Sequence, residues 1–207
     1  MNILVVAATE VEIAPFLAQN SLADVLITGV GVPACMYALT KKLAQKKYDL
    51  VIQAGIAGTF KSKFLLGKTF AVKKDLFADL GIHENAKFYT LFEKGFTHKD
   101  EPPFFKGKLV NATENFFSLT AVNAITVNTV SDNYLINELY QTKYDADIES
   151  MEGAAFHYVC LQESVPFLQI RSISNFVGER VKTNWKMKES IQNLNDNLCR
   201  IIKTAQQ

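Results

Sequence analysis

Short apolar runs rich in valine and isoleucine alternate with helical patterns along the first third of the chain. The runs at 3–8, 25–31 and 49–58 (ILVVAA, VLITGVG and DLVIQAGIAG) show little polar alternation, which is typical of strands buried on both faces. A helix or turn begins at Glu10. Residues 33–47 form a helical pattern with one apolar side and lysines near its end, as the helix dipole favours.

The rest of the chain repeats this alternation less regularly. One longer strand is expected within 68–81, and further elements are predicted as strands at 109–113, 123–130 and 166–174 and as helices at 132–143, 152–163 and from about Trp185 to Thr204. Residues 83–107 are aromatic, charged and interrupted by proline, so we expect a loop or excursion there. Apolar strands separated by helices predict a three-layer α/β/α fold with a mostly parallel, mixed central sheet.

Length and charge narrow the class of protein. The chain has 207 residues, about the size of one ordinary domain, and a formal net charge of +1. We therefore expect a single domain over 1–207, with no nucleic-acid or membrane partner. Cys35, Cys160 and Cys199 are far apart, which favours reduced thiols over a disulfide framework, and no metal-ligand spacing is present.

The N-terminus opens with an apolar run, MNILVVAA. No basic segment precedes this run, and Glu10 and Glu12 interrupt it too early for a secretory signal. No uninterrupted apolar stretch is long enough to cross a bilayer. These features predict a cytoplasmic protein.

Five short segments fall at the ends of predicted strands or just before a helix. They are Glu10 and Glu12, Gly29 and Gly31, Gly55 to Gly58, Met151-Glu152, and Ser174-Asn175. Ligand-binding groups collect at the carboxyl ends of strands in such sheets, so these segments are candidates for one site. Each alone also has a structural explanation: an acid at a helix start complements the dipole, and a glycine or asparagine suits a turn or cap. GVGVPA lacks the third glycine and the downstream acid of a dinucleotide fingerprint, and no cofactor is expected.

Taken in order, the segments ATEVEI, GVGVPA, AGIAG, SMEGAAF and RSISN resemble the motifs of the nucleoside phosphorylase and nucleosidase superfamily. The block SMEGAAFHYVCLQESVPFLQIRSISN, followed by Arg180 and Trp185, is most similar to the futalosine hydrolases of the alternative menaquinone pathway. The resemblance spans essentially the whole chain, with few anchors in 60–125. It implies hydrolysis of the N-glycosidic bond of futalosine with release of hypoxanthine. A methylthioadenosine/S-adenosylhomocysteine or aminodeoxyfutalosine nucleosidase and an inactive purine-nucleoside-binding protein are the alternatives.

The resemblance also implies roles for individual residues. Glu12 aligns with the glutamate that orients and deprotonates the attacking water, and Glu10 is the second choice. Glu152 aligns with the glutamate that accepts hydrogen bonds from the ribose hydroxyls, and Met151 with a residue packed against the ribose or, alternatively, filling the core.

Further aligned residues surround the base and the water. Ala57, Gly58 and Tyr134 fall where the superfamily encloses the base, and the residue aligned with Tyr134 stacks on the purine. Arg171 is unusual in an apolar strand and needs an acid partner if buried, so we predict an Arg171–Glu12 contact or a structural ion pair with another acid. The adenine nucleosidases have serine where this chain has Ile56, and Ser174 is the residue expected to replace that hydroxyl.

Asn175 stands where the adenine-specific members have aspartate. A 6-oxopurine presents acceptors at both N7 and O6, and an ionised carboxylate would place an acceptor against them. The amide of asparagine offers N–H donors instead. Mismatched buried polar groups cost about 1–3 kcal/mol each, which is enough to select between bases. Asn175 therefore predicts recognition of hypoxanthine.

The 5′ end of the substrate is harder to assign. The aromatic-rich middle of the chain supplies either an apolar lid or ordinary core packing, through Phe88, Tyr89, Phe92, Phe96, Phe104, Phe105, Phe116 and Phe117. Arg180 or Lys182 are candidates to bind a substrate carboxylate. Many relatives pair so that a neighbour closes the 5′ pocket, and we therefore expect a homodimer or higher homo-oligomer.

Overall fold

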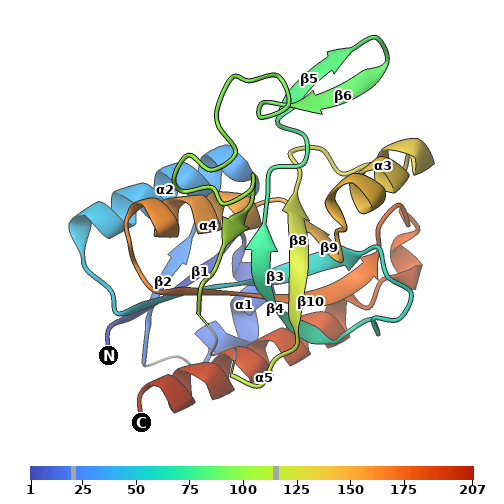
Figure 1. Ribbon diagram of the computed structural model, residues 1–207. Coiled ribbons are helices and arrows are strands. Elements are labelled where there is room, and N and C mark those ends of the chain that lie inside the picture. Colours follow the sequence, from blue (N-terminus) through green and yellow to red (C-terminus); the bar gives the residue numbers. More distant parts are fainter. Residues whose placement is uncertain (20–21, 114–116) are drawn as a thin grey trace.

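A mixed sheet with helices on both faces forms the body of the molecule (Figure 1). The computed structural model describes residues 1–19, 22–113 and 117–207. The strands are β1 (Ile3–Ala7), β2 (Asp24–Ile27), β3 (Leu50–Thr59), β4 (Thr69–Asp75), β5 (Gly81–Glu84), β6 (Lys87–Thr90), β7 (Leu109–Val110), β8 (Ala121–Thr126), β9 (Ile148–Ser150) and β10 (Phe167–Phe176). The α-helices are α1 (Glu10–Leu17), α2 (Val32–Gln45), α3 (Tyr134–Tyr144), α4 (Gly153–Gln162) and α5 (Met187–Ala205), and a 3₁₀ turn covers Lys182–Asn184.

The pairing of the strands confirms the predicted fold class. It also closes part of the sheet into a barrel, which the sequence did not predict. β2, β1, β3 and β10 are parallel neighbours, while β10 pairs with β4 and β3 pairs with β9 in antiparallel fashion. β4, β8 and β9 are joined by parallel pairs. The hydrogen-bonded pairs therefore close a circuit through β3, β10, β4, β8 and β9, which makes one end of the sheet a small barrel.

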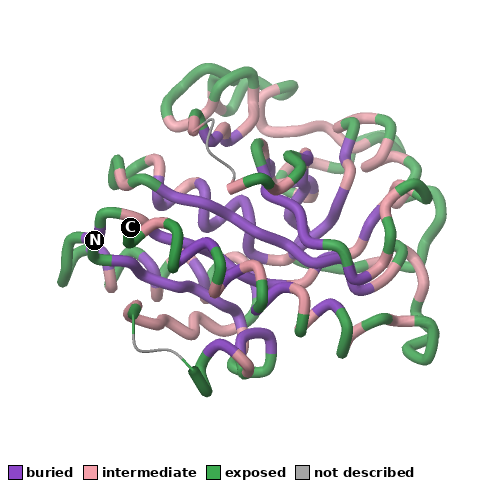
Figure 2. Tube along the Cα trace, turned by 90° about the horizontal axis from the view of Figure 1, so that it is seen from below, coloured by how far each residue is buried: buried purple, intermediate pink, exposed green. Residues whose placement is uncertain are grey.

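Alternation along the strands divides the core between the two faces of the sheet. On β1, Ile3, Val5 and Ala7 pack with α1 and α5, whereas Leu4 and Val6 pack with α2 and α4. The buried residues accordingly follow the strands through the centre of the molecule, and exposed residues lie on its outside (Figure 2). β1 is apolar throughout because both of its faces are covered.

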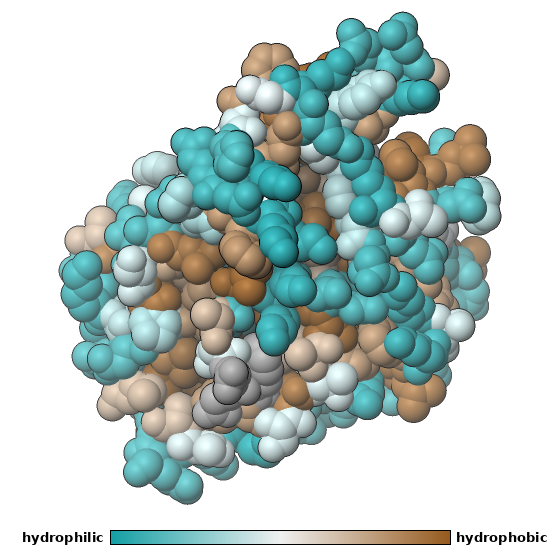
Figure 3. Space-filling model, viewed as in Figure 1, coloured by the Kyte–Doolittle hydropathy of each residue, from teal (hydrophilic) through white to brown (hydrophobic). Residues whose placement is uncertain are grey.

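The least regular part of the sequence holds one predicted strand and a hairpin that was not predicted. The strand expected within 68–81 is β4, which ends at Asp75. The stretch expected as a loop or excursion carries the β5–β6 hairpin, which projects from the body and is covered mainly by hydrophilic residues (Figures 1 and 3). The short strand β9 was not predicted, because three residues are too few to show a pattern. Within 1–19, 22–113 and 117–207, no helix has both the length and the apolar character needed to cross a membrane.

Candidate active site

A cleft of about 360 Å³ opens where β1, β3, β9 and β10 end and α4 begins. It brings together most of the residues that the sequence proposed for the site: Glu12, Ala57, Gly58, Met151, Glu152, Ser174 and Asn175. Their segments are spread along the chain from Glu12 to Asn175, and only the sheet places them side by side. Arg171 lies beneath the cleft, and Tyr134 lies outside it.

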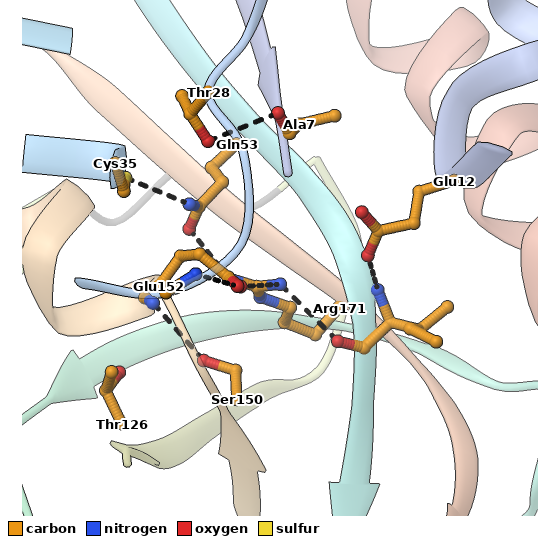
Figure 4. Close-up of polar contacts among 12 residues, drawn as sticks. Ala7, Glu12, Thr28, Cys35, Gln53, Thr126, Ser150, Glu152 and Arg171 are labelled. Carbon is orange, nitrogen blue, oxygen red and sulfur yellow. Dashed lines mark hydrogen bonds and ion pairs between the residues drawn. The ribbon is translucent and has the colours of Figure 1, made fainter. Parts of the chain in front are cut away.

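Glu12 is held from both ends of its carboxylate. It occupies the first turn of α1, where Oε2 accepts hydrogen bonds from the Thr9 backbone N–H (3.1 Å) and hydroxyl (3.0 Å). Oε1 accepts from the Ile56 backbone N–H at 3.1 Å (Figure 4). The carboxylate therefore both caps the helix and faces the cleft. Glu10, the second choice for the base, is exposed on the same helix and does not line the cleft.

Asn195 of α5 fixes the turn of α1 that carries Glu12. Pro15 lies inside α1 and Ile13 has non-helical backbone angles, so the helical ladder is interrupted there. The Asn195 side chain takes the place of the missing bond: its amide N–H donates to the Glu12 carbonyl (2.9 Å) and its Oδ1 accepts from Phe16 N–H (3.0 Å). These two hydrogen bonds anchor α1 to α5 at Glu12, the residue whose side chain extends into the cleft.

Glu152 and Arg171 form a buried ion pair at the floor of the cleft (Figure 4). Arg171 Nη1 lies 3.6 Å from Glu152 Oε2, and Glu152 Oε1 accepts a hydrogen bond from Gly31 N–H at 3.0 Å. Arg171 also donates to Gln53 Oε1 (2.9 Å) and to the Ile56 carbonyl (3.4 Å). Of the two predictions for Arg171, a contact with Glu12 or an ion pair with another acid, the second is confirmed, and the acid partner is Glu152, at the beginning of α4.

Gly55 explains how so large a side chain reaches the floor. Arg171 is in register with Gly55 on the neighbouring strand, and a Cβ at Gly55 would collide with Arg171 Nη1. The same Cβ would lie 3.1 Å from Glu12 Oε1. Gly55 therefore leaves space for the Arg171 guanidinium beside Glu12 and Glu152. The sequence had suggested a turn for this glycine.

A further buried acid, Asp75, lies deeper in the fold. Asp75 is fully buried, and its Oδ1 accepts hydrogen bonds from Leu76 N–H (2.8 Å) and the Thr126 hydroxyl (3.0 Å). Burial raises the pKa of this carboxyl to about 7. His157, also fully buried, contacts the Leu109 carbonyl through Nδ1, and burial lowers its pKa to about 3. Neither side chain lines the cleft, so both support the fold behind the site.

A β-bulge turns Asn175 toward the cleft. The register of β10 against β3 shifts between Ile173 and Asn175, so that Ile173 opposes Ala57 and Asn175 opposes Gly58. Asn175 Oδ1 accepts from the Ser174 hydroxyl at 2.7 Å, and Nδ2 donates to the Phe176 carbonyl at 2.8 Å. The Ser174 hydroxyl orients this amide, and its expected role in holding the water stays a prediction.

Several residues of the cleft were missed, and one aromatic prediction does not fit. Tyr134 is 69% exposed, and its hydroxyl donates to Glu138. The aromatic side chain that lines the cleft is Trp185, whose ring lies 5.8 Å from the Arg180 guanidinium carbon. Glu149 also lines the cleft. In the sequence it stands three residues before Glu152, in IESME, and this nearness to Glu152 could have indicated it.

The aromatic residues of the middle segment lie elsewhere. Phe92 and Phe104 stack edge-on, with ring centroids 5.1 Å apart, and line a separate cavity of about 610 Å³. Phe117 packs against the core beside α5. Phe88, Tyr89, Phe96 and Phe105 do not line the cleft, and Phe116 falls outside the described residues. Of the two predictions for this segment, core packing is confirmed for Phe117, and among the described residues none of these aromatic side chains lines the cleft as a lid would.

The comparisons with known proteins agree with this arrangement. The model of the phosphorylase superfamily matches residues 23–207. The chain belongs to the phosphorylase superfamily. Within it, futalosine hydrolase of Streptomyces coelicolor is 30% identical over 183 residues, which cover 84% of this chain and 75% of that protein. Futalosine hydrolase of Thermus thermophilus is 27% identical over 175 residues, 82% of this chain and 76% of that protein.

Solved structures of the superfamily share the fold. The native structure of futalosine hydrolase of Helicobacter pylori strain 26695 superimposes with a TM-score of 0.82 at 15% identity, over 99% of this chain and 98% of that chain. The 5′-methylthioadenosine/S-adenosylhomocysteine nucleosidase of Helicobacter pylori with butyl-thio-DADMe-Immucillin-A gives the same values. At this identity the likeness establishes the architecture, and the residues of the cleft must indicate the substrate.

Proposed function

We propose that the chain hydrolyses the N-glycosidic bond of futalosine, releasing hypoxanthine and dehypoxanthine futalosine. The observation that carries the proposal is that Glu12, Glu152 and Asn175 line one cleft, which supplies a base, a partner for the sugar and a partner for the purine. Support for the choice of substrate comes from the curated relatives, which are named futalosine hydrolases.

Glu12 is the general base. Its carboxylate is held by Thr9 and Ile56 and retains lone pairs toward the cleft. A water molecule attacks C1′ of the ribose and gives its proton to Glu12, while the bond from C1′ to the purine nitrogen breaks and its electron pair leaves with the base. Help of this kind is worth about 10² to 10⁴ in rate.

Glu152 binds the ribose of the substrate. Each of its oxygens has one protein partner, Gly31 N–H or Arg171, so lone pairs remain to accept hydrogen bonds from the ribose hydroxyls. Its negative charge favours the positive charge that builds on the sugar as the bond breaks. Arg171 lies under the cleft and acts as a positioning residue for Glu152. Met151 lines the cleft next to it and packs against the ribose.

Asn175 receives the leaving base. Ser174 occupies its Oδ1 and the Phe176 carbonyl occupies one N–H, so the second N–H is the group left for N7 or O6 of hypoxanthine. This hydrogen bond stabilises the negative charge on the departing purine. Among the described residues that line the cleft, Arg180 is the one basic side chain, which favours water over phosphate as the nucleophile.

The test is incubation of the purified chain with futalosine, with and without phosphate, while hypoxanthine is followed by chromatography. We expect release that does not depend on phosphate. Glu12→Gln should lower kcat at least 10²-fold, and Glu10→Gln, on the same helix turn but outside the cleft, is its matched control. Phosphate-dependent release would indicate a phosphorylase, and binding without turnover would indicate a nucleoside sensor.

The base preference has its own test. Asn175→Asp should shift kcat/KM from futalosine toward its 6-amino counterpart, because a protonated carboxyl matches the donor and acceptor of a 6-aminopurine. If the ratio of the two kcat/KM values is unchanged, the amide does not read the base. If the wild-type chain itself prefers a 6-amino substrate, a methylthioadenosine/S-adenosylhomocysteine or aminodeoxyfutalosine nucleosidase becomes the better proposal.

We also propose that two or more copies of the chain assemble. Val11 and Val30 line the cleft and are 67% and 56% exposed, so its rim is apolar where a neighbour could cover it. Sedimentation equilibrium of the full chain measures the assembly, and a monomer at micromolar concentration would contradict this proposal.

A further inference from the structure

Glu149 lies in one row with Asn175 across three neighbouring strands. Gly58 of β3 is in register with Asn175 of β10 on one side and with Glu149 of β9 on the other. Residues in register across a sheet point to the same face, and all three residues line the cleft. The amide and the carboxylate are thus two strand spacings apart, roughly 10 Å between their backbones.

Gly58 keeps the space between these two side chains open. A Cβ on Gly58 would lie 3.4 Å from Asn175 Nδ2 and 3.0 Å from Val177 Cγ2. Without that atom the middle of the row is a flat floor of backbone. A planar base can lie over this floor with one edge at Asn175 and the opposite edge at Glu149, because the span suits a purine with a hydrogen bond of about 2.9 Å at each end.

The carboxylate of Glu149 has no protein donor among the described residues. No hydrogen bond or ion pair to it is formed by residues 1–19, 22–113 or 117–207, although the residue is only 7% exposed. Burial raises its pKa to about 7, the nearby charge of Asp79 adds to the rise, and Arg180 opposes it. This largely buried carboxylate faces the cleft without a protein donor, so it is available to accept a hydrogen bond from a bound ligand.

A 6-oxopurine supplies that donor. Hypoxanthine carries N–H at N1, on the edge away from N7, whereas adenine carries a bare acceptor there. We propose that Glu149 accepts a hydrogen bond from the purine N1–H and, opposite Asn175, makes the cleft selective for 6-oxopurines. This inference rests on the proposed function, because it adds a specificity residue to the same base site.

The competing explanation is that Glu149 only balances the charge of Arg180. That structural role would affect every substrate alike, whereas recognition of N1–H depends on the base. Binding of free bases separates the two explanations and does not require turnover. Its outcome therefore stands apart from the outcome for futalosine hydrolysis.

The experiment is isothermal titration of the full chain with hypoxanthine, 1-methylhypoxanthine and adenine. We expect the wild-type chain to bind hypoxanthine about 5- to 150-fold more tightly than the other two bases, as one mismatched polar group of about 1–3 kcal/mol predicts. Glu149→Met, which removes the acceptor at similar size, should lose this preference. Glu149→Gln, which keeps a neutral acceptor, should retain part of it.

Glu163→Gln, at an exposed position beyond the end of α4, is the matched control and should bind as the wild-type chain does. Thermal melts confirm that each variant is folded. The proposal is overturned if Glu149→Met weakens all three bases equally, or if the wild-type chain does not distinguish hypoxanthine from 1-methylhypoxanthine. Absence of futalosine hydrolysis with the base preference intact would instead overturn the proposed function alone.

Discussion

Arg171→Met replaces the buried guanidinium under the cleft with an apolar side chain of similar length. Arg171 is 1% exposed and Glu152 is 4% exposed. After the substitution, Glu152 keeps its hydrogen bond from Gly31 but loses its cation, and Gln53 Oε1 loses its donor. Removing one partner of a buried ion pair costs about 3–5 kcal/mol, because the remaining charge is uncompensated. We expect the free energy of unfolding to fall by that amount.

A second substitution separates the charge from the packing. Glu152→Gln removes the uncompensated charge, so the double variant should be more stable than the sum of the two single losses, by about 1–3 kcal/mol. Urea denaturation followed by circular dichroism measures all four proteins. The matched control is Lys46→Met: Lys46 lies 2.9 Å from Asp24, closer than the 3.6 Å of the buried pair, but the two side chains are 47% and 39% exposed to solvent. It should cost less than about 1 kcal/mol.

Burial outweighs distance in setting the strength of these two ion pairs, and either of two results would contradict this. If Arg171→Met costs no more than Lys46→Met, the buried pair contributes nothing beyond an exposed one. If the two losses at Arg171 and Glu152 simply add, the cost comes from packing and the charge of Glu152 is already compensated elsewhere.

Three further substitutions probe the supports of the site. Asn195→Leu should lower the free energy of unfolding by about 1–3 kcal/mol, because two backbone groups of α1 lose their hydrogen-bond partners. In steady-state kinetics, kcat should fall more than KM rises, because Glu12 shifts. An unchanged kcat would contradict this. Gly55→Ala should displace the Arg171 guanidinium and abolish turnover, as a hypoxanthine-release assay would show. The pKa of Asp75 rises from 3.8 to about 7 on folding, so its contribution to stability is present at low pH and lost as the pH rises through 7. Asp75→Asn should therefore gain stability relative to wild type between pH 4 and pH 7.5 in urea titrations, and a constant difference would refute the assignment.

Much of the site could be predicted because its groups sit in short segments with distinct composition. ATEVEI and SMEGAAF each place an acid at the beginning of a helix that follows an apolar strand, and parallel strands bring such ends to one edge of a sheet. The prediction therefore needed only local pattern and the rule for strand ends. Tyr134 failed because it belongs to α3, whose position against the barrel no local pattern encodes; α3 turns this ring to solvent.

Apolar runs and their order along the chain were enough to determine the layers, the faces that the helices cover and the segments that reach the cleft. Tertiary structure alone decided which charges meet: Arg171 passes over Gly55 to Glu152 because those two strands are in register, and register depends on pairing between distant segments. It also decided which way Asn175 faces. Simple alternation would place Asn175 on the same face as Ile173, inside the barrel, and the bulge between them turns it outward, in line with Gly58 and Glu149. A one-residue shift in pairing moves a side chain to the opposite face of a sheet, and the sequence of one strand does not contain the position of its neighbour.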